Sequence, residues 1–169
     1  FPGGLAIATI VSCSIFAAIS GSSVATAATI STVAFPAMIK RGYHRNFTLG
    51  ILAAGGTLGI LIPPSIPMIV YAFVVEESVL TMFLAGIGPG IMLALFFIIF
   101  SIFYVLVFNK EVQNVKSTRE EKIEYTKKGL PILLMAFIML GGIYAGIYTP
   151  TEAGGIGFLI SFIYVVVKK

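Results

Sequence analysis

Long apolar segments separated by short polar ones dominate the chain. Residues 47–75 and 89–108 are long enough to cross a bilayer, which takes about 20 residues in a helix. Two apolar arms near the start, 5–19 and 24–39, are shorter and are joined by small polar residues. The pattern predicts an all-α polytopic membrane protein. Its expected parts are a re-entrant helical hairpin over 1–39, a Pro-broken transmembrane helix over 46–78, an interfacial helix and a span over 79–108, a cytoplasmic amphipathic connector over 109–128, and two transmembrane helices over 129–169.

Composition supports a membrane protein. The chain has 169 residues, of which 58% are hydrophobic and only 11% charged, whereas a soluble domain carries about a quarter charged residues. The net charge of +4 is spread over short clusters between apolar segments, so it indicates membrane orientation and not a surface for nucleic acid. Because the first residues are already apolar and the last two lysines follow a span, we expect an internal part of a longer protein.

Charge also predicts the topology. Lys and Arg mark the cytoplasmic side, and they gather at 40–45, 109–128 and 168–169. The connections 76–88 and 148–152 carry Glu and no Lys or Arg. The spans between these segments therefore alternate in direction.

Two parts of this topology leave alternatives. The arms within 1–39 fit a hairpin that enters and leaves on the cytoplasmic side, which we favour, but two short spans with a tight periplasmic turn satisfy the same charge rule. The polar residues 109–128 fit either a short amphipathic surface helix, with Glu and Lys at helical spacing, or a disordered loop.

The prolines at 63 and 64 interrupt an apolar helix at membrane depth. Because neither has an N–H group, we expect the carbonyls of Gly59 and Ile60 to lose their helical partners. Irregular backbone survives in a membrane only where protein buries it or water bathes it, and transporters use such carbonyls to bind Na⁺. Glycines at 55, 56 and 59 would let another backbone approach closely. The alternative is a simple kink.

The turn Ser20-Gly21-Ser22-Ser23 supplies hydroxyls and free N–H groups at a helix start, where anions bind. A carboxylate substrate would face Ser22, Ser23 and Thr26. The same hydroxyls would alternatively complete a cation shell with the two carbonyls, or bond only to their own backbone.

Catalysis has little support in the sequence. No Glu, Asp, Lys or Arg lies within an apolar span, and no phosphate-binding loop is present, so we expect no enzyme. Cys13 fits a small buried packing residue. Thr149, Pro150 and Glu152 fit a capping box at a helix start, which we favour over a proton-carrying role for Glu152.

Four segments in order, 18–27, 38–43, 55–67 and 148–153, resemble the large membrane subunit of tripartite ATP-independent periplasmic (TRAP) transporters. The resemblance covers nearly the whole chain and corresponds to a middle stretch of that subunit. It implies a Na⁺-coupled importer of organic acids of the C4-dicarboxylate or sialic-acid type, in the bacterial inner membrane, with an elevator mechanism. The implied partners are a periplasmic substrate-binding protein, a small TRAP membrane subunit, the bilayer, and the rest of the same large subunit.

The resemblance also implies a first Na⁺ site between the hairpin tip and the Pro-Pro break. The second repeat and second hairpin of the family are absent here, so the complete substrate site is not expected in this piece. Two alternatives stay open: a carboxylate/Na⁺ symporter without a binding protein, and a structural scaffold subunit, which predicts ordinary helices at both breaks. The expected Na⁺ ligands are Ser20, Ser22, Gly56, Thr57, Gly59, Ile60 and Ser65.

Overall fold

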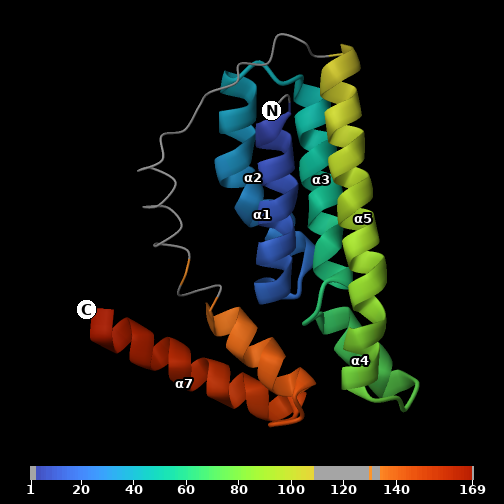
Figure 1. Ribbon diagram of the computed structural model, residues 1–169. Helices are drawn as coiled ribbons and strands as arrows, with labels where there is room; N and C mark the ends of the chain where they lie inside the picture. Colours follow the sequence, from blue (N-terminus) through green and yellow to red (C-terminus); the bar gives the residue numbers. More distant parts are fainter. Residues whose placement is uncertain (1–2, 109–129, 131–133, 169) are drawn as a thin grey trace. The chain divides into compact units, whose positions relative to one another are not determined.

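The computed structural model describes residues 3–108, 130 and 134–168. These residues form helices joined by short turns, with no strand among them, so the all-α prediction is confirmed. They fall into two compact units, residues 1–116 and 117–169. The first unit contains α1 (Gly4–Ser20), α2 (Ser23–Lys40), α3 (Arg45–Leu61), α4 (Ile66–Val74) and α5 (Val79–Phe108); the second contains a helix over Leu134–Tyr144 and α7 (Pro150–Lys168) (Figure 1).

Helices α1 and α2 form the expected helix–turn–helix. Gly21 ends α1 in the left-handed region at φ 60°, and its N–H donates to the Ala17 carbonyl at 2.9 Å. Glycine adopts this conformation without steric cost, which makes it a common helix terminator. Ser22 is then extended and caps α2, its hydroxyl accepting from the Ala25 N–H at 3.4 Å. Whether the hairpin is re-entrant stays a prediction, although α2 alone is long and apolar enough to cross a membrane.

The predicted break in the next apolar segment is confirmed. Helix α3 ends at Leu61, Ile62 is extended, and α4 begins at Ile66 after an equally extended Ser65. A residue before proline is driven away from helical geometry, which explains why α3 ends where it does. The two helices bend by 42° and together form one broken span by length and composition.

Helix α5 differs from the prediction. The chain forms one helix from Val79 to Phe108 with Pro89 inside it, not an interfacial helix followed by a span that starts at Pro89. Proline deprives one carbonyl of its N–H, but membrane helices tolerate this where neighbouring groups pack closely. Here Gly86 and Gly90 flank the proline and face the Leu61 carbonyl: a Cβ on them would lie 2.9 and 3.5 Å from its oxygen. The packing of α5 on the break therefore keeps the helix continuous.

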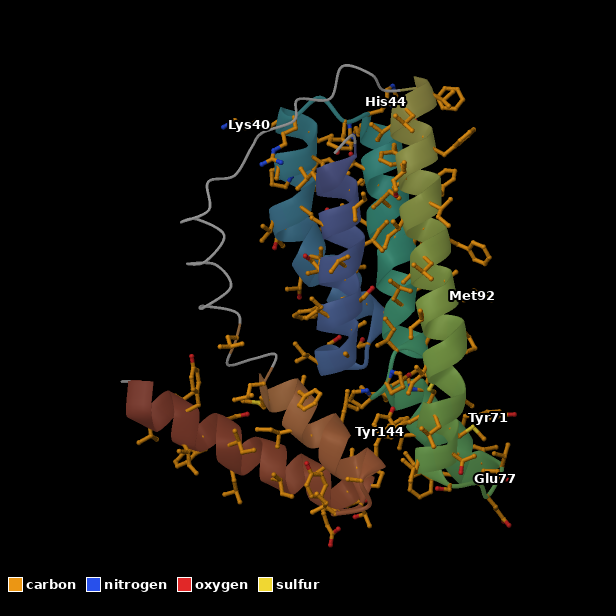
Figure 2. All side chains as sticks on the ribbon, viewed as in Figure 1. Lys40, His44, Tyr71, Glu77, Met92 and Tyr144 are labelled. Atoms are coloured by element: carbon orange, nitrogen blue, oxygen red, sulfur yellow. The ribbon has the colours of Figure 1, made fainter. Side chains whose placement is uncertain are left out.

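The hairpin, α3 and α5 lie side by side (Figure 1). The Phe47 ring stacks on Tyr104 with 4.2 Å between ring centroids, which joins the start of α3 to the end of α5. These two helices are therefore antiparallel, as the alternating charges predict. Figure 2 shows Lys40 and His44 at one end of the unit and Tyr71 and Glu77 at the other.

The second unit confirms the capping box. The Thr149 N–H donates to a Glu152 carboxylate oxygen at 2.7 Å, and the Glu152 N–H donates to the Thr149 hydroxyl at 3.3 Å, at the start of α7. The helix before it is held by Tyr148, whose hydroxyl donates to the Ile138 carbonyl at 2.6 Å. The predicted connector over 109–128, and part of the span expected from residue 130, lie outside the described residues.

Candidate functional site

The hydroxyls of the hairpin tip converge on one carbonyl. Thr26 is fully buried, and its hydroxyl donates to the Ser22 carbonyl at 2.7 Å. Ser20 Oγ lies 3.0 Å from the Thr26 hydroxyl and 3.4 Å from the Ser22 carbonyl oxygen. The Thr26 N–H reaches the same oxygen at 3.0 Å. Ser20 and Thr26 therefore fix the shape of the tip, and the Thr26 hydroxyl is bonded within it.

Ser23 is different from its neighbours in the tip. Its side chain is half-buried, and its hydroxyl bonds to none of the described residues. It is the first residue of α2, so it lies among the N–H groups that have no partner within the helix. Of the three residues predicted to bind substrate, Ser23 has its hydroxyl most free for a ligand.

The Ile60 carbonyl, one of the two predicted to lack a hydrogen-bond donor, has one. The Ser65 hydroxyl donates to the Ile60 carbonyl at 2.8 Å, and the Ser65 side chain is fully buried. A side chain five residues further on thus replaces the N–H that Pro64 lacks. A carbonyl oxygen has two lone pairs, so Ile60 can still accept a second partner. The Gly59 carbonyl has no helical donor, because residue 63 is proline.

The tip and the break meet backbone to backbone. A Cβ placed on Gly59 would lie 2.7 Å from the Ser22 carbonyl oxygen and 2.8 Å from the Ser23 nitrogen. Gly56 faces the Ser23 carbonyl in the same way, at 3.2 Å. Real Cβ atoms essentially never approach within 3.0 Å, so only glycine fits at residue 59. The prediction of close backbone approach is confirmed for Gly56 and Gly59, whereas Gly55 meets the side chain of Cys13.

A second contact, which the sequence analysis did not identify, ties the tip to the far side of the break. The Ile66 N–H donates to the Gly21 carbonyl at 3.2 Å. A Cβ on Gly21 would lie 2.7 Å from the Pro64 carbonyl oxygen. The signal available in the sequence was the glycine between two serines, since a positive φ and a close approach both require that residue type.

Not every predicted ligand lies at this junction. Thr57 is exposed, and its hydroxyl donates to the Ala54 carbonyl at 2.6 Å on its own helix. The side chain of Ile60 is 41% exposed, so only its backbone is relevant to a site. Ser20, Ser22, Gly56 and Gly59 are brought together by the contacts described above, and Ser65 adjoins them through the Ile60 carbonyl.

The chemistry offered by this junction is that of neutral oxygens. The predicted ligands carry only hydroxyls and carbonyls, and the described residues hold no cluster of His, Cys, Asp and Glu fit for a transition metal. Cys13 is fully buried against Gly55, as expected of a packing residue. Hydroxyl and carbonyl oxygens suit a hard monovalent cation, and the N-terminus of α2 suits an anion.

These features define an integral membrane protein with broken helices of the kind found in secondary transporters. The whole chain, residues 1–169, matches the family described as the tripartite ATP-independent periplasmic transporter, DctM component, and the protein belongs to that family. The resemblance noted from the sequence is thereby confirmed.

The names of curated relatives refer to several substrates. The chain is 43% identical over 168 residues to a C4-dicarboxylate TRAP transporter large permease protein of Pseudomonas aeruginosa, a match covering 96% of this chain and 39% of the relative. It is 38% identical to an ectoine TRAP transporter large permease protein of Halomonas elongata, over 89% of this chain and 35% of the relative. It is 40% identical to an isethionate TRAP transporter permease protein of Oleidesulfovibrio alaskensis, over 92% of this chain and 24% of the relative. The chain therefore spans well under half the length of these relatives.

Proposed function

We propose that this chain is part of a Na⁺-coupled importer of small organic acids, and that the junction of hairpin tip and broken helix is its first Na⁺ site. The observation that carries the proposal is the backbone contact between Gly59 and Ser22. It puts Gly59, whose carbonyl has no helical donor, beside a turn rich in oxygens, and unwound transporter helices use such carbonyls to coordinate Na⁺.

The cation ligands that we propose are the Ser22 hydroxyl and oxygens of Ser20, Gly59 and Ile60, because the Ser22 carbonyl already accepts from the hydroxyl and the N–H of Thr26. The hydroxyls at residues 20, 26 and 65 are already held by other protein groups, so they orient the backbone oxygens around them. A shell held in place before the ion arrives costs little reorganisation on binding. The interrupted helices on both sides of this shell argue against a plain scaffold subunit, which predicts continuous helices at both places.

For the substrate, we propose an anion whose acidic group meets the start of α2 at Ser23. The named substrates of the three relatives, a C4-dicarboxylate, ectoine and isethionate, each carry a carboxylate or a sulfonate. Such a group suits a free hydroxyl beside unpaired N–H groups. Sialic acid also carries a carboxylate and remains within the proposal.

The membrane location and partners that we propose are those expected from the family. The full subunit would lie in the bacterial inner membrane and work with a small membrane subunit and a periplasmic substrate-binding protein. An elevator motion of a mobile part against a static one stays a prediction. The alternative is a symporter that needs no binding protein. An uptake assay with and without added binding protein distinguishes the two.

The test uses the full-length permease purified with its small subunit. The midpoint of thermal unfolding is measured in NaCl and in KCl of equal concentration, without substrate. If Na⁺ binds only the folded protein, a tenfold excess over its dissociation constant stabilises it by about 1.4 kcal/mol. We expect a higher midpoint in Na⁺ that is lost in Ser22→Ala. Equal midpoints in the two salts, or an unchanged Na⁺ effect in Ser22→Ala, contradict the proposed site.

A further inference from the structure

The break between α3 and α4 has a second close neighbour besides the hairpin tip, and that neighbour is α5. Gly86 is buried near the start of α5, and a Cβ placed on it would lie 2.9 Å from the Leu61 carbonyl oxygen. Leu61 is the last residue of α3 and directly follows Ile60, whose carbonyl is one of the proposed Na⁺ ligands. Since Gly59 contacts the tip, the end of α3 makes close backbone contacts with two other segments.

The approach of α5 to Leu61 is closest at Gly86. A Cβ on Gly90, one turn further along the helix, would lie 3.5 Å from the same oxygen, which is an ordinary contact. Gly88 is exposed, and a Cβ there would meet nothing within 4 Å. The three glycines of one helix thus differ in how closely an added methyl group would approach the break.

Gly86 also lies against the other side of the break. A Cβ there would overlap Met68 Cε and would lie 2.9 Å from Met68 Sδ. Met68 belongs to α4, which packs on α5 (Figure 1). The end of a methionine side chain is flexible and can turn away from a new methyl group, whereas the Leu61 carbonyl is part of a planar peptide and cannot. The contact with Leu61 is therefore the one that a side chain at residue 86 would displace.

The displacement would fall mainly on the end of α3. Helix α5 is a single helix of 30 residues, whereas the Gly59 carbonyl has lost its helical donor to proline. A carbon atom and a carbonyl oxygen in contact lie about 3.3–3.6 Å apart, so an alanine at residue 86 would move the Leu61 oxygen by about half an ångström. The Ile60 and Leu61 carbonyls belong to adjacent peptide planes that share one Cα, so the Ile60 oxygen would move as well.

We propose that Gly86 is a positioning residue for the Na⁺ site. Because it has no side chain, it sets the separation between α5 and the end of α3, and thereby the place of the Gly59 and Ile60 carbonyls beside the hairpin tip. This inference rests on the proposed Na⁺ site. Gly86 touches no ion and acts only through the backbone of Leu61. A role in folding alone would change the stability of the protein and leave its affinity for Na⁺ unaltered.

The test uses the full-length permease purified with its small subunit. The midpoint of thermal unfolding is measured at increasing NaCl, with KCl keeping the ionic strength constant, and the rise in midpoint gives the apparent dissociation constant of Na⁺. The midpoint in KCl alone reports stability separately. A displacement of about 1 Å costs about 100-fold at a site built on positioning, so half of it should raise this dissociation constant about tenfold in Gly86→Ala. The matched control Gly88→Ala should keep the wild-type value.

A double variant separates the two contacts of residue 86. Gly86→Ala combined with Met68→Ala removes the side-chain contact and leaves the contact with Leu61, so the raised dissociation constant should persist. A return to the wild-type value would assign the effect to Met68 and overturn the proposed route through Leu61.

A second substitution covers the case in which Gly86→Ala does not assemble. Gly90→Val adds branched carbons against the same Leu61 carbonyl, and Gly88→Val is its control on the open side of the helix. An unchanged Na⁺ dissociation constant in Gly86→Ala or, where that variant does not assemble, in Gly90→Val overturns the inference and leaves the Na⁺ site standing. A wild-type protein whose midpoint is the same in the two salts refutes the proposed Na⁺ site itself, and this inference with it.

Discussion

Replacement of Gly59 by alanine tests the proposed ion site, because it should reduce Na⁺-dependent uptake far more than it reduces the stability of the fold. The new Cβ would lie 2.7 Å from the Ser22 carbonyl carbon and oxygen. Carbon atoms in ordinary contact are 3.5–4.0 Å apart, so the tip and α3 must separate by about 1 Å. Both groups in contact are backbone, so no side chain can rotate away.

The stability cost of this change is partly offset. Overpacking costs about 1–3 kcal/mol, whereas alanine improves on glycine inside a helix by about 1 kcal/mol. We expect a net loss of about 0–2 kcal/mol in the free energy of unfolding. A displacement of about 1 Å at a site built on positioning can cost about 100-fold in activity. Na⁺-dependent uptake should therefore fall far more than stability.

The assay is uptake by proteoliposomes that hold the full-length permease and its small subunit, with a periplasmic binding protein and a C4-dicarboxylate outside. Gly50→Ala is the matched control on the same helix, because a Cβ there meets nothing within 4 Å. The control should keep its uptake, and Gly59→Ala should lose nearly all of it while keeping a cooperative unfolding transition. Unchanged uptake and Na⁺ dependence in Gly59→Ala would refute the assignment of this junction as the ion site.

Three further changes test single hydrogen bonds. Ser65→Ala leaves the Ile60 carbonyl without its donor, which should cost about 1–3 kcal/mol in the free energy of unfolding; an unchanged unfolding midpoint would contradict this. Thr26→Val keeps the side-chain shape but removes the donor to the Ser22 carbonyl, so the Na⁺-induced rise in midpoint should shrink, whereas Thr26→Ser should retain it. Glu152→Ala should lower the midpoint through loss of the capping box, by about 1 kcal/mol, whereas Glu152→Gln should keep most of the stability; equal losses would count against the cap.

Local chemistry explains what the sequence could predict. Pro63 and Pro64 lack N–H groups wherever they lie, so the end of α3 follows from covalent structure. The capping box at Thr149 and Glu152 likewise depends on residues three apart on one chain segment. Local chemistry could not give the partner of Gly59, since a glycine signals a close approach without naming the segment that approaches; the pairing of tip and break followed only from the family resemblance.

Helix α5 shows why the remaining features resisted prediction. Proline favours the first turn of a helix, so the sequence around Pro89 predicted a helix start. The structure continues the helix through it, because Gly86 and Gly90 seat α5 against the Leu61 carbonyl. The bond from Ser65 to the Ile60 carbonyl is a similar case, since it exists only in the particular turn that the prolines make.

The hydrogen bond from Ser65 to the Ile60 carbonyl changes how the break between α3 and α4 is interpreted. Unpaired oxygens in a membrane are costly, and a site made only of them would collapse onto any donor nearby. Here side-chain hydroxyls hold the Ile60 and Ser22 carbonyls. The Ile60 carbonyl has a second lone pair to offer, whereas the Ser22 carbonyl already accepts from both the hydroxyl and the N–H of Thr26. The Gly59 carbonyl has no helical donor, and Gly59 itself packs closely against the backbone of Ser22 and Ser23. Thr26 and Ser65 thus act mainly as supports, and the Gly59 and Ile60 carbonyls are the backbone oxygens best suited to the proposed ion.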